Sequence, residues 1–127
     1  MMNRSKSADA MLPLTPAVFH ILLALSDGER HGYAIMREVG AHTNGALQLG
    51  PGTLYGCLKR MLAARLVEEA DERPDPELDD ERRRYYRITD FGARTLRAEA
   101  ERLAVAVSAA RAKRLFGRKV GFAGAKR

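Results

Sequence analysis

Three observations predict a mainly helical fold that carries one small β-hairpin. Four segments of the 127-residue chain place apolar residues three or four positions apart, the spacing of a helix with one buried face. Two shorter runs, at about residues 66–69 and 82–88, have the composition of strands, and a charged segment long enough for a hairpin tip separates them. The length allows one domain with one modest core. Together these features indicate a single small domain dominated by helices.

The first two helices are delimited by residues that favour helix ends. Thr15 is a candidate N-cap followed by a proline, and Gly28 is expected to end this first helix. A second helix is predicted over residues 32–42, followed by a turn at Asn44-Gly45 and a short strand over residues 46–49. The side chains predicted to be buried are Val18, Ile21, Leu22 and Leu25 on the first helix, and Tyr33, Ile35, Met36 and Val39 on the second.

A third helix is predicted to begin at Pro51, with Gly50 as its cap. Its two sides differ in chemistry, because one is apolar and the other carries hydroxyl, small and basic side chains. The apolar stripe consists of Leu54, Leu58, Met61 and Leu62, and the other side of Thr53, Gly56, Lys59, Arg60 and Ala63.

The predicted hairpin joins a basic, aromatic strand to an acidic tip. Alternation places Arg84, Tyr86 and Ile88 on one face of the second strand, with Tyr86 expected in the core. Arg83, Tyr85 and Arg87 share the other face. Residues 71–81 hold seven acidic residues, two prolines and one arginine, a composition typical of a loop.

The last helix is predicted to run from an N-cap at Thr89 to about Phe116 and to end at Gly117. It carries an apolar seam at heptad-like spacing, and such a seam needs a surface to pack against. We therefore expect this helix to mediate dimerisation. The seam consists of Leu96, Ala100, Leu103, Val107 and Ala110.

The order helix, helix, strand, helix, strand, strand, helix is that of a winged helix-turn-helix with a long additional C-terminal helix. We expect four parts along the chain. These are a disordered segment over residues 1–10, a winged-helix DNA-binding domain over 11–88, a dimerisation helix over 89–116 and a flexible basic tail over 117–127.

Composition narrows the class of partner. A formal net charge of +6 favours an anionic partner such as nucleic acid. The single cysteine, Cys57, cannot form an intrachain disulfide, so we expect a cytoplasmic location and assign this thiol to the core. The longest uncharged run, residues 10–26, is too short and too interrupted to cross a membrane.

The third helix is the predicted recognition helix of a double-stranded DNA-binding protein. Thr53 can contact base edges in the major groove, while Lys59 and Arg60 can contact phosphates or guanines. The N-terminus of the helix also offers backbone N–H groups to a phosphate. Tyr33 and Tyr55 are candidate phosphate contacts through their hydroxyl groups, and the alternative for each is a core ring.

The start of the second strand is predicted to bind the phosphate backbone of DNA. A basic, aromatic cluster suited to phosphates is formed there by Arg82, Arg83, Arg84 and Tyr85. The alternative is that the arginines pair with the acidic loop, in exposed ion pairs that contribute only about 0–1 kcal/mol. We expect the acidic loop to compete with DNA for these arginines.

These motifs resemble the PadR family of bacterial transcription regulators over roughly residues 14–103. The residues that carry the resemblance are His31-Gly32-Tyr33, Pro51-Gly52-Thr53-Leu54-Tyr55, Leu58-Lys59-Arg60, Arg84-Tyr85-Tyr86-Arg87-Ile88-Thr89 and Gly92.

The resemblance implies a winged-helix homodimer that represses transcription from a palindromic operator, with the C-terminal helix crossing to the partner protomer. It also implies release from DNA by a small-molecule inducer bound near the dimer interface. Three features depart from the family pattern. Arg65 stands where relatives commonly have glycine, the wing tip is acidic, and the chain has no tryptophan with which to line a drug-binding cavity.

No enzyme, metal site or cofactor is predicted, because no catalytic constellation or metal-ligand spacing is present in the sequence. Two alternatives to operator recognition stay open. One is a winged helix that binds an acidic protein, and the other is an RNA-binding adaptor that prefers single strands or hairpins.

Overall fold

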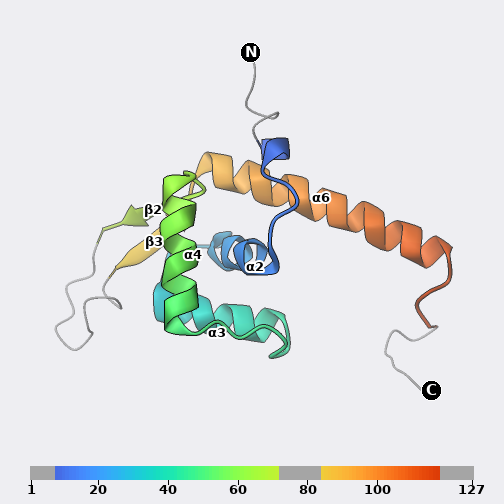
Figure 1. The fold of residues 1–127 in the computed structure, drawn as a ribbon, viewed down its shortest axis with the longest axis horizontal. Coiled ribbons are helices and arrows are strands. Elements are labelled where there is room, and N and C mark those ends of the chain that lie inside the picture. The colour runs from blue at the N-terminus through green and yellow to red at the C-terminus, as the bar shows by residue number, and fades with distance from the viewer. Residues whose placement is uncertain (1–7, 72–83, 118–127) are drawn as a thin grey trace, which may run out of the picture.

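The computed structural model describes residues 8–71 and 84–117, and it confirms a mainly helical fold with a small sheet and a long C-terminal helix (Figure 1). Residues 8–10, which we expected to be disordered, form a helical turn with Ala8 buried. Residues 1–7, the wing tip over 72–83 and the tail from 118 lie outside the described residues. The elements are α2 (Pro16–Leu25), β1 (Arg30–His31), α3 (Gly32–His42), α4 (Pro51–Ala63), β2 (Val67–Ala70), β3 (Tyr85–Ile88) and α6 (Asp90–Ala112).

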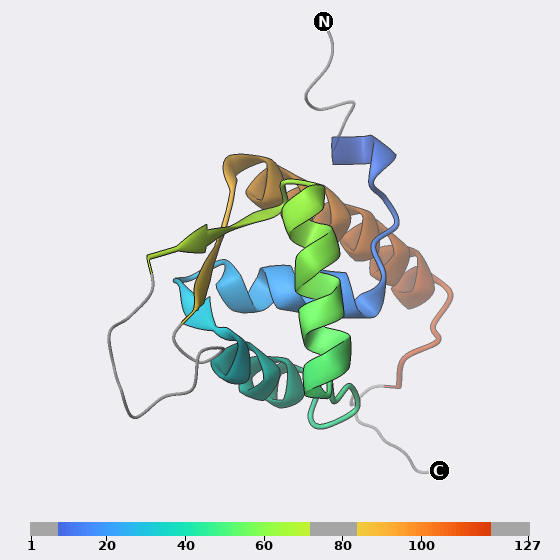
Figure 2. The same ribbon diagram turned by 60° about the vertical axis from the view of Figure 1, so that its left-hand side comes forward.

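Helix α2 lies at the centre of the fold, where it contacts α3, α4, α6 and β3 (Figures 1 and 2). The face predicted to be apolar is buried at Ile21, Leu22 and Leu25. The helix ends at Leu25 rather than at Gly28, since the next backbone bonds span three residues: Ser26 N donates to Leu23 O at 3.2 Å and Gly28 N to Leu25 O at 3.4 Å. The core therefore forms around α2, and the other helices pack on it.

The sheet has the antiparallel order β1-β3-β2, with Glu68 opposite Arg87. Its third strand was predicted over residues 46–49, and this prediction is wrong. That segment is unpaired because the Thr43 hydroxyl accepts from Leu47 N at 3.0 Å and holds the chain close to the end of α3. The third strand is instead β1, whose His31 has the extended backbone of a helix N-cap and so can pair with β3.

Side chains cap three of the four long helices. Thr15 Oγ1 accepts from Val18 N at 3.2 Å, and His31 Nδ1 accepts from Ala34 N at 3.1 Å. Thr89 Oγ1 accepts from Gly92 N at 2.9 Å, as expected for the cap of α6. Helix α4 differs, because no side chain caps the N-terminus that begins at Gly50.

Helix α4 ends in a left-handed turn at Arg65, whose φ is 64°. Leu66 N donates to Met61 O at 2.9 Å and Arg65 N donates to Leu62 O at 3.1 Å, the two bonds of a Schellman motif. Arg65 therefore takes the left-handed conformation that glycine would prefer, and the turn keeps the geometry that a glycine would give it.

Arg65→Gly is expected to raise the free energy of unfolding by about 1 kcal/mol, because glycine adopts a positive φ without steric penalty. Urea denaturation measures the change. Arg65→Ala is the matched control, since alanine removes the side chain but keeps the strained backbone, and it should stay close to wild type. Equal stabilisation by both substitutions would show that the strain argument is wrong.

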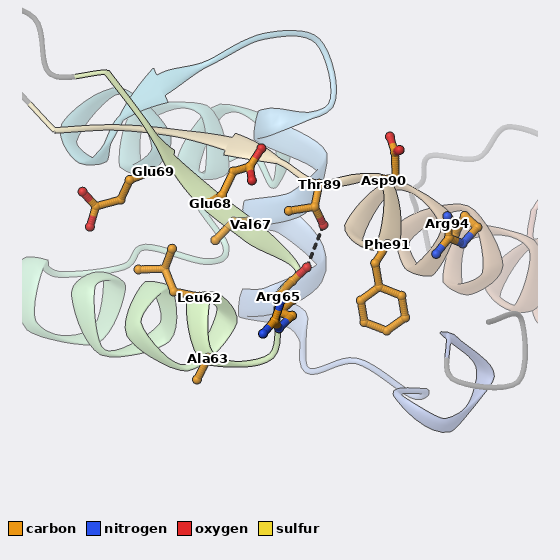
Figure 3. Close-up of a pocket in the computed structure, with 10 residues that line it drawn as sticks. All are labelled: Leu62, Ala63, Arg65, Val67, Glu68, Glu69, Thr89, Asp90, Phe91 and Arg94. Carbon is orange, nitrogen blue, oxygen red and sulfur yellow. Dashed lines mark hydrogen bonds between the residues drawn. The ribbon is translucent and has the colours of Figure 1, made fainter. Parts of the chain in front are cut away.

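The start of α6 is joined to the chain just after α4 through Thr89, whose backbone N–H donates to Leu66 O at 3.1 Å. Thr89 Oγ1 donates to Arg65 O at 2.7 Å and lies 3.1 Å from Leu66 O (Figure 3). At its other end, α6 stops at Ala112 rather than at Phe116, because Arg114 takes a positive φ of 59° and closes a second turn of the same kind. Helix α6 thus begins anchored to α4, and its distal part projects beyond the other helices (Figure 1).

Glu99 is a buried carboxylate that joins α6 to the segment before α2. Its side chain is 2% exposed, and its Oε2 accepts from Leu14 N at 3.0 Å. The Arg102 guanidinium donates to Oε1 at 2.6 Å. Hydrogen bonding from Arg102, assisted by that from Leu14, lowers the pKa of Glu99 below its ordinary value of 4.5, although burial opposes the shift.

Glu99→Gln is expected to lower the free energy of unfolding at pH 7 by about 1–2 kcal/mol, because a charged acceptor is replaced by a neutral one. The folded-state pKa is depressed, so the contribution of the carboxylate is present above its unfolded pKa and is lost as pH falls through the folded value. The gap between the two proteins, measured by denaturation from pH 7 downward, should therefore close at acid pH. Glu101→Gln, at an exposed carboxylate, should show no such gap.

Candidate nucleic-acid interface

Helices α3 and α4 pack against each other across a tight turn and form a helix-turn-helix (Figure 2). Asn44 and Gly45 both have positive φ, which confirms the predicted turn. On α4, the buried side chains include Leu54, Cys57 and Leu58. This burial fixes the rotation of α4 and leaves its hydroxyl and basic side exposed.

Three of the predicted contact residues are exposed along α4, namely Thr53 in its first turn and Lys59 and Arg60 near its end. Among the described residues, none of the salt bridges involves Lys59 or Arg60, so neither cation is neutralised there. Arg60 Nη2 lies 3.4 Å from Cys57 Sγ, which directs this guanidinium back along the helix. The uncapped N-terminus of α4 precedes Thr53 and adds backbone N–H groups to the same surface.

Tyr55 lies half-buried against the start of α3. A Cβ atom at Gly32 would overlap the Tyr55 hydroxyl and ring, so glycine is required there for this packing. The first two residues of the His-Gly-Tyr motif thus have a structural role. His31 caps α3, and the missing side chain of Gly32 leaves room for the Tyr55 ring of α4.

Tyr33 was predicted to be buried on α3, and this prediction is wrong. Its side chain is 43% exposed, and the Arg37 guanidinium carbon lies 5.4 Å from the centre of its ring. The helical periodicity failed here because Tyr33 stands in the first turn of α3, beyond the edge of the core. Its exposure keeps the predicted phosphate contact sterically open.

The structure describes only part of the basic, aromatic cluster predicted at the start of β3. Arg82 and Arg83 lie outside the described residues, and Tyr85 is half-buried with its ring edge-on to His31 at 5.3 Å. Tyr86 is buried, as predicted.

Arg87, on the outer face of β3, is held by two carboxylates. Its Nε lies 2.8 Å from Glu68 Oε2 and its Nη1 lies 3.4 Å from Glu29 Oε2. Hydrogen bonds to Glu68 and then Glu29 raise the pKa of Arg87 above its ordinary value. The carboxylates that pair with Arg87 therefore lie in the loop before β1 and on the neighbouring strand β2. Both are distant from Arg87 in sequence, and the pairing of the strands brings them close to it.

The predicted dimerisation seam runs along α6 from a covered part to an open part. Leu96 is half-buried against the core, whereas Ala100, Leu103 and Val107 are exposed. Beyond Glu99, every described residue of α6 except Ala110 is exposed. An apolar groove of about 350 Å³ adjoins the seam and is lined by Phe19 and Leu23 of α2 together with Leu96 and Ala100.

A larger open pocket of about 940 Å³ lies behind the wing, between the end of α4, strand β2 and the start of α6 (Figure 3). Leu62, Val67 and Phe91 supply its apolar lining. Arg94 also lines it, and its Nε is buried without a hydrogen-bond partner among the described residues. Three carboxylates and two arginines share the lining, so this pocket has no single charge preference.

Within the described ranges, no three histidine, cysteine, aspartate or glutamate side chains come together as a metal-binding set. In the same part of the chain, every helix is too short or too polar to span a membrane.

A small winged helix whose helix-turn-helix exposes unneutralised cations belongs to the class of transcriptional regulators of this fold. Residues 21–98 match the family model of PadR-like transcriptional regulators, and this match covers more than half of the chain. The chain therefore belongs to the PadR-like family, as its motifs predicted.

Known proteins extend this likeness. A PadR family transcription regulator from Clostridium difficile has a TM-score of 0.63 at 22% identity, over 76% of this chain and 96% of that one. A PadR-like regulator from Bacillus cereus has a TM-score of 0.62 at 24% identity, over 89% and 99%. A 37.1 kDa protein in a Streptomyces fradiae transposon is 38% identical over 87 residues, which are 66% of this chain but only 22% of that protein's length.

Proposed function

We propose that this protein is a sequence-specific repressor that binds a palindromic double-stranded DNA operator as a homodimer. The observation that carries the proposal is the exposed side of α4, which presents Thr53 beside an uncapped helix N-terminus and Lys59 and Arg60 further along the helix. Because α4 is the second helix of a helix-turn-helix, this side would enter the major groove while α3 crosses the backbone.

The seam on α6 supports the homodimer. Leu103 and Val107 are large apolar side chains on a helix that its own protomer leaves uncovered. A second copy of α6 would cover them, and the small side chain of Ala100 allows close approach. Two recognition helices would then meet half-sites about 34–36 Å apart, one helical turn of DNA.

Selection of bound duplexes from a random DNA pool tests the proposal directly. Recovery of a palindrome would support both operator reading and two-fold symmetry. A preference for single-stranded or hairpin RNA in competition would favour the RNA adaptor instead, and absence of any enriched duplex would contradict the proposal. Repression can then be measured by transcription in vitro from a promoter that overlaps the selected sequence.

Substitutions on α4 should separate affinity from specificity. Lys59→Ala should weaken binding to all duplexes and reduce the slope of log affinity against log salt by about 0.9 per lost phosphate contact, or about 1.8 per dimer. Thr53→Ala should change base preference within the half-site with little effect on this slope. Fluorescence anisotropy over a salt series measures both effects. Wild-type behaviour of both variants on the selected operator would refute the helix assignment.

We further propose that a small molecule relieves repression by binding in the apolar groove between α2 and α6. The groove supports this because residues of the seam, Leu96 and Ala100, form part of its lining. A ligand there could alter dimer geometry. Compounds can be screened by release of labelled operator, and Leu23→Trp should abolish the response of an active compound by filling the groove. Retained response in this variant would place the ligand elsewhere.

A further inference from the structure

A third hollow lies on the helix-turn-helix itself, beside the proposed recognition helix α4. It has a volume of about 350 Å³ and lies between α3 and the turn that leads into α4. Tyr33, Met36 and Arg37 line it from α3, and Gln48 and Leu49 line it from the segment before the α4 cap. The hollow therefore adjoins the N-terminus of the helix that would enter the groove.

Arg37 gives this hollow an unneutralised positive charge. Among the described residues, the only recorded partner of its guanidinium is the Tyr33 ring, at 5.4 Å. Arg30 provides the contrast, because it lies 3.1 Å from Asp27 and 3.7 Å from Glu38. Both arginines belong to the same part of the fold, yet only Arg37 keeps its charge available to a ligand.

The remaining lining suits a sugar-phosphate unit. The side-chain nitrogen of Gln48 donates to Gly45 O over 3.4 Å, which is a long and weak hydrogen bond. A stronger acceptor, such as a phosphate oxygen, can take the place of this carbonyl. Met36, which is half-buried, offers apolar surface for a deoxyribose ring. The Tyr33 ring restrains the Arg37 guanidinium, which reduces the side-chain entropy lost on binding.

We propose that this hollow binds one phosphate of the DNA backbone, with Arg37 supplying the charge and Gln48 a neutral donor. The proposal rests on the proposed operator binding and adds a contact from the first helix of the helix-turn-helix, which crosses the backbone in this fold. The contact is independent of sequence, so it fixes the position of α4 in the groove without reading a base.

Two substitutions at one position test the charge. Arg37→Gln removes the charge from an exposed helical site, and Arg37→Lys keeps it, while both new residues favour helix about equally. Arg37→Gln should reduce the salt slope by about 1.8 per dimer, so a fourfold rise in salt should weaken its binding about 12-fold less than that of wild type. Arg37→Lys should keep the wild-type slope. Both variants should keep the wild-type melting temperature.

Lys59→Ala, measured in the same salt series, distinguishes failure of this inference from failure of the proposed function. A reduced slope for Lys59→Ala together with a wild-type slope for Arg37→Gln would overturn the phosphate site and leave operator binding intact. Equal slope losses in Arg37→Gln and Arg37→Lys would also overturn it, because the effect would not follow the charge. Wild-type slopes in all the variants would overturn both the phosphate site and the assignment of Lys59 to a phosphate contact, whereas failure to select any duplex would overturn the proposed function.

Discussion

Gly92→Ala is expected to lower the free energy of unfolding by about 3 kcal/mol, the largest stability effect predicted for a single methyl group in this protein. A Cβ atom at this position would overlap the carbonyl oxygen of Leu66 and lie 2.9 Å from Ile88 Cγ1. The obstacle is backbone, so it cannot move away as a flexible side chain would. Relief would require α6 to shift away from the end of α4.

Gly40→Ala is the matched control, since Gly40 also lies in a helix but a Cβ atom there would meet nothing within 4 Å. Alanine should therefore stabilise α3 by about 1 kcal/mol through its higher helix propensity. Urea denaturation of both variants gives the comparison. Similar changes in both would show that the close approach of Gly92 to Leu66 does not limit stability.

Replacing Leu103 and Val107 together with aspartate is expected to dissociate the dimer and to weaken operator binding at least about 100-fold. Four carboxylates would face one another across a two-fold interface that is proposed to be apolar. Operator affinity falls because linking two DNA-binding units, each bound to one half-site, raises affinity by about 10²–10⁴-fold. Sedimentation velocity measures the oligomeric state, and a mobility-shift assay measures operator affinity.

Val105→Asp serves as the control for this prediction. Val105 is 69% exposed, yet it points to the opposite side of α6 from the seam. The substitution changes an exposed valine to aspartate on the same helix, so it should leave the dimer and its operator affinity unchanged. Dissociation by Val105→Asp alone would show that the seam has been assigned to the wrong face.

The sequence predicted the features that depend on neighbouring residues. Periodicity and end signals gave α3 its observed bounds, and Thr89 and Pro51 were identified at the starts of their helices. The burial of Cys57 and Tyr86 was also predicted. These successes share one cause, because helix caps and periodic burial depend on residues only a few positions apart.

The errors concern contacts between distant residues. The pairing of β1 with β3 and the neutralisation of Arg87 by Glu29 depend on chain segments more than fifty positions apart. Arg37 was overlooked because its importance comes from a hollow that includes Gln48, beyond the end of its own helix. The early end of α6 depends on a non-glycine residue, Arg114, in a left-handed conformation that sequence patterns assign to Gly117.

The Thr89 hydroxyl links the proposed dimerisation helix α6 to the proposed recognition helix α4. One side chain caps α6 and also donates to the backbone at the end of α4, so it couples the start of one helix to the end of the other. In a dimer held together by α6, a change in the crossing angle of the two α6 helices would change the orientation of both α4 helices without deforming them. The spacing between the half-sites to which the protein binds would then depend on the geometry of the α6 dimer interface, which is far from the DNA.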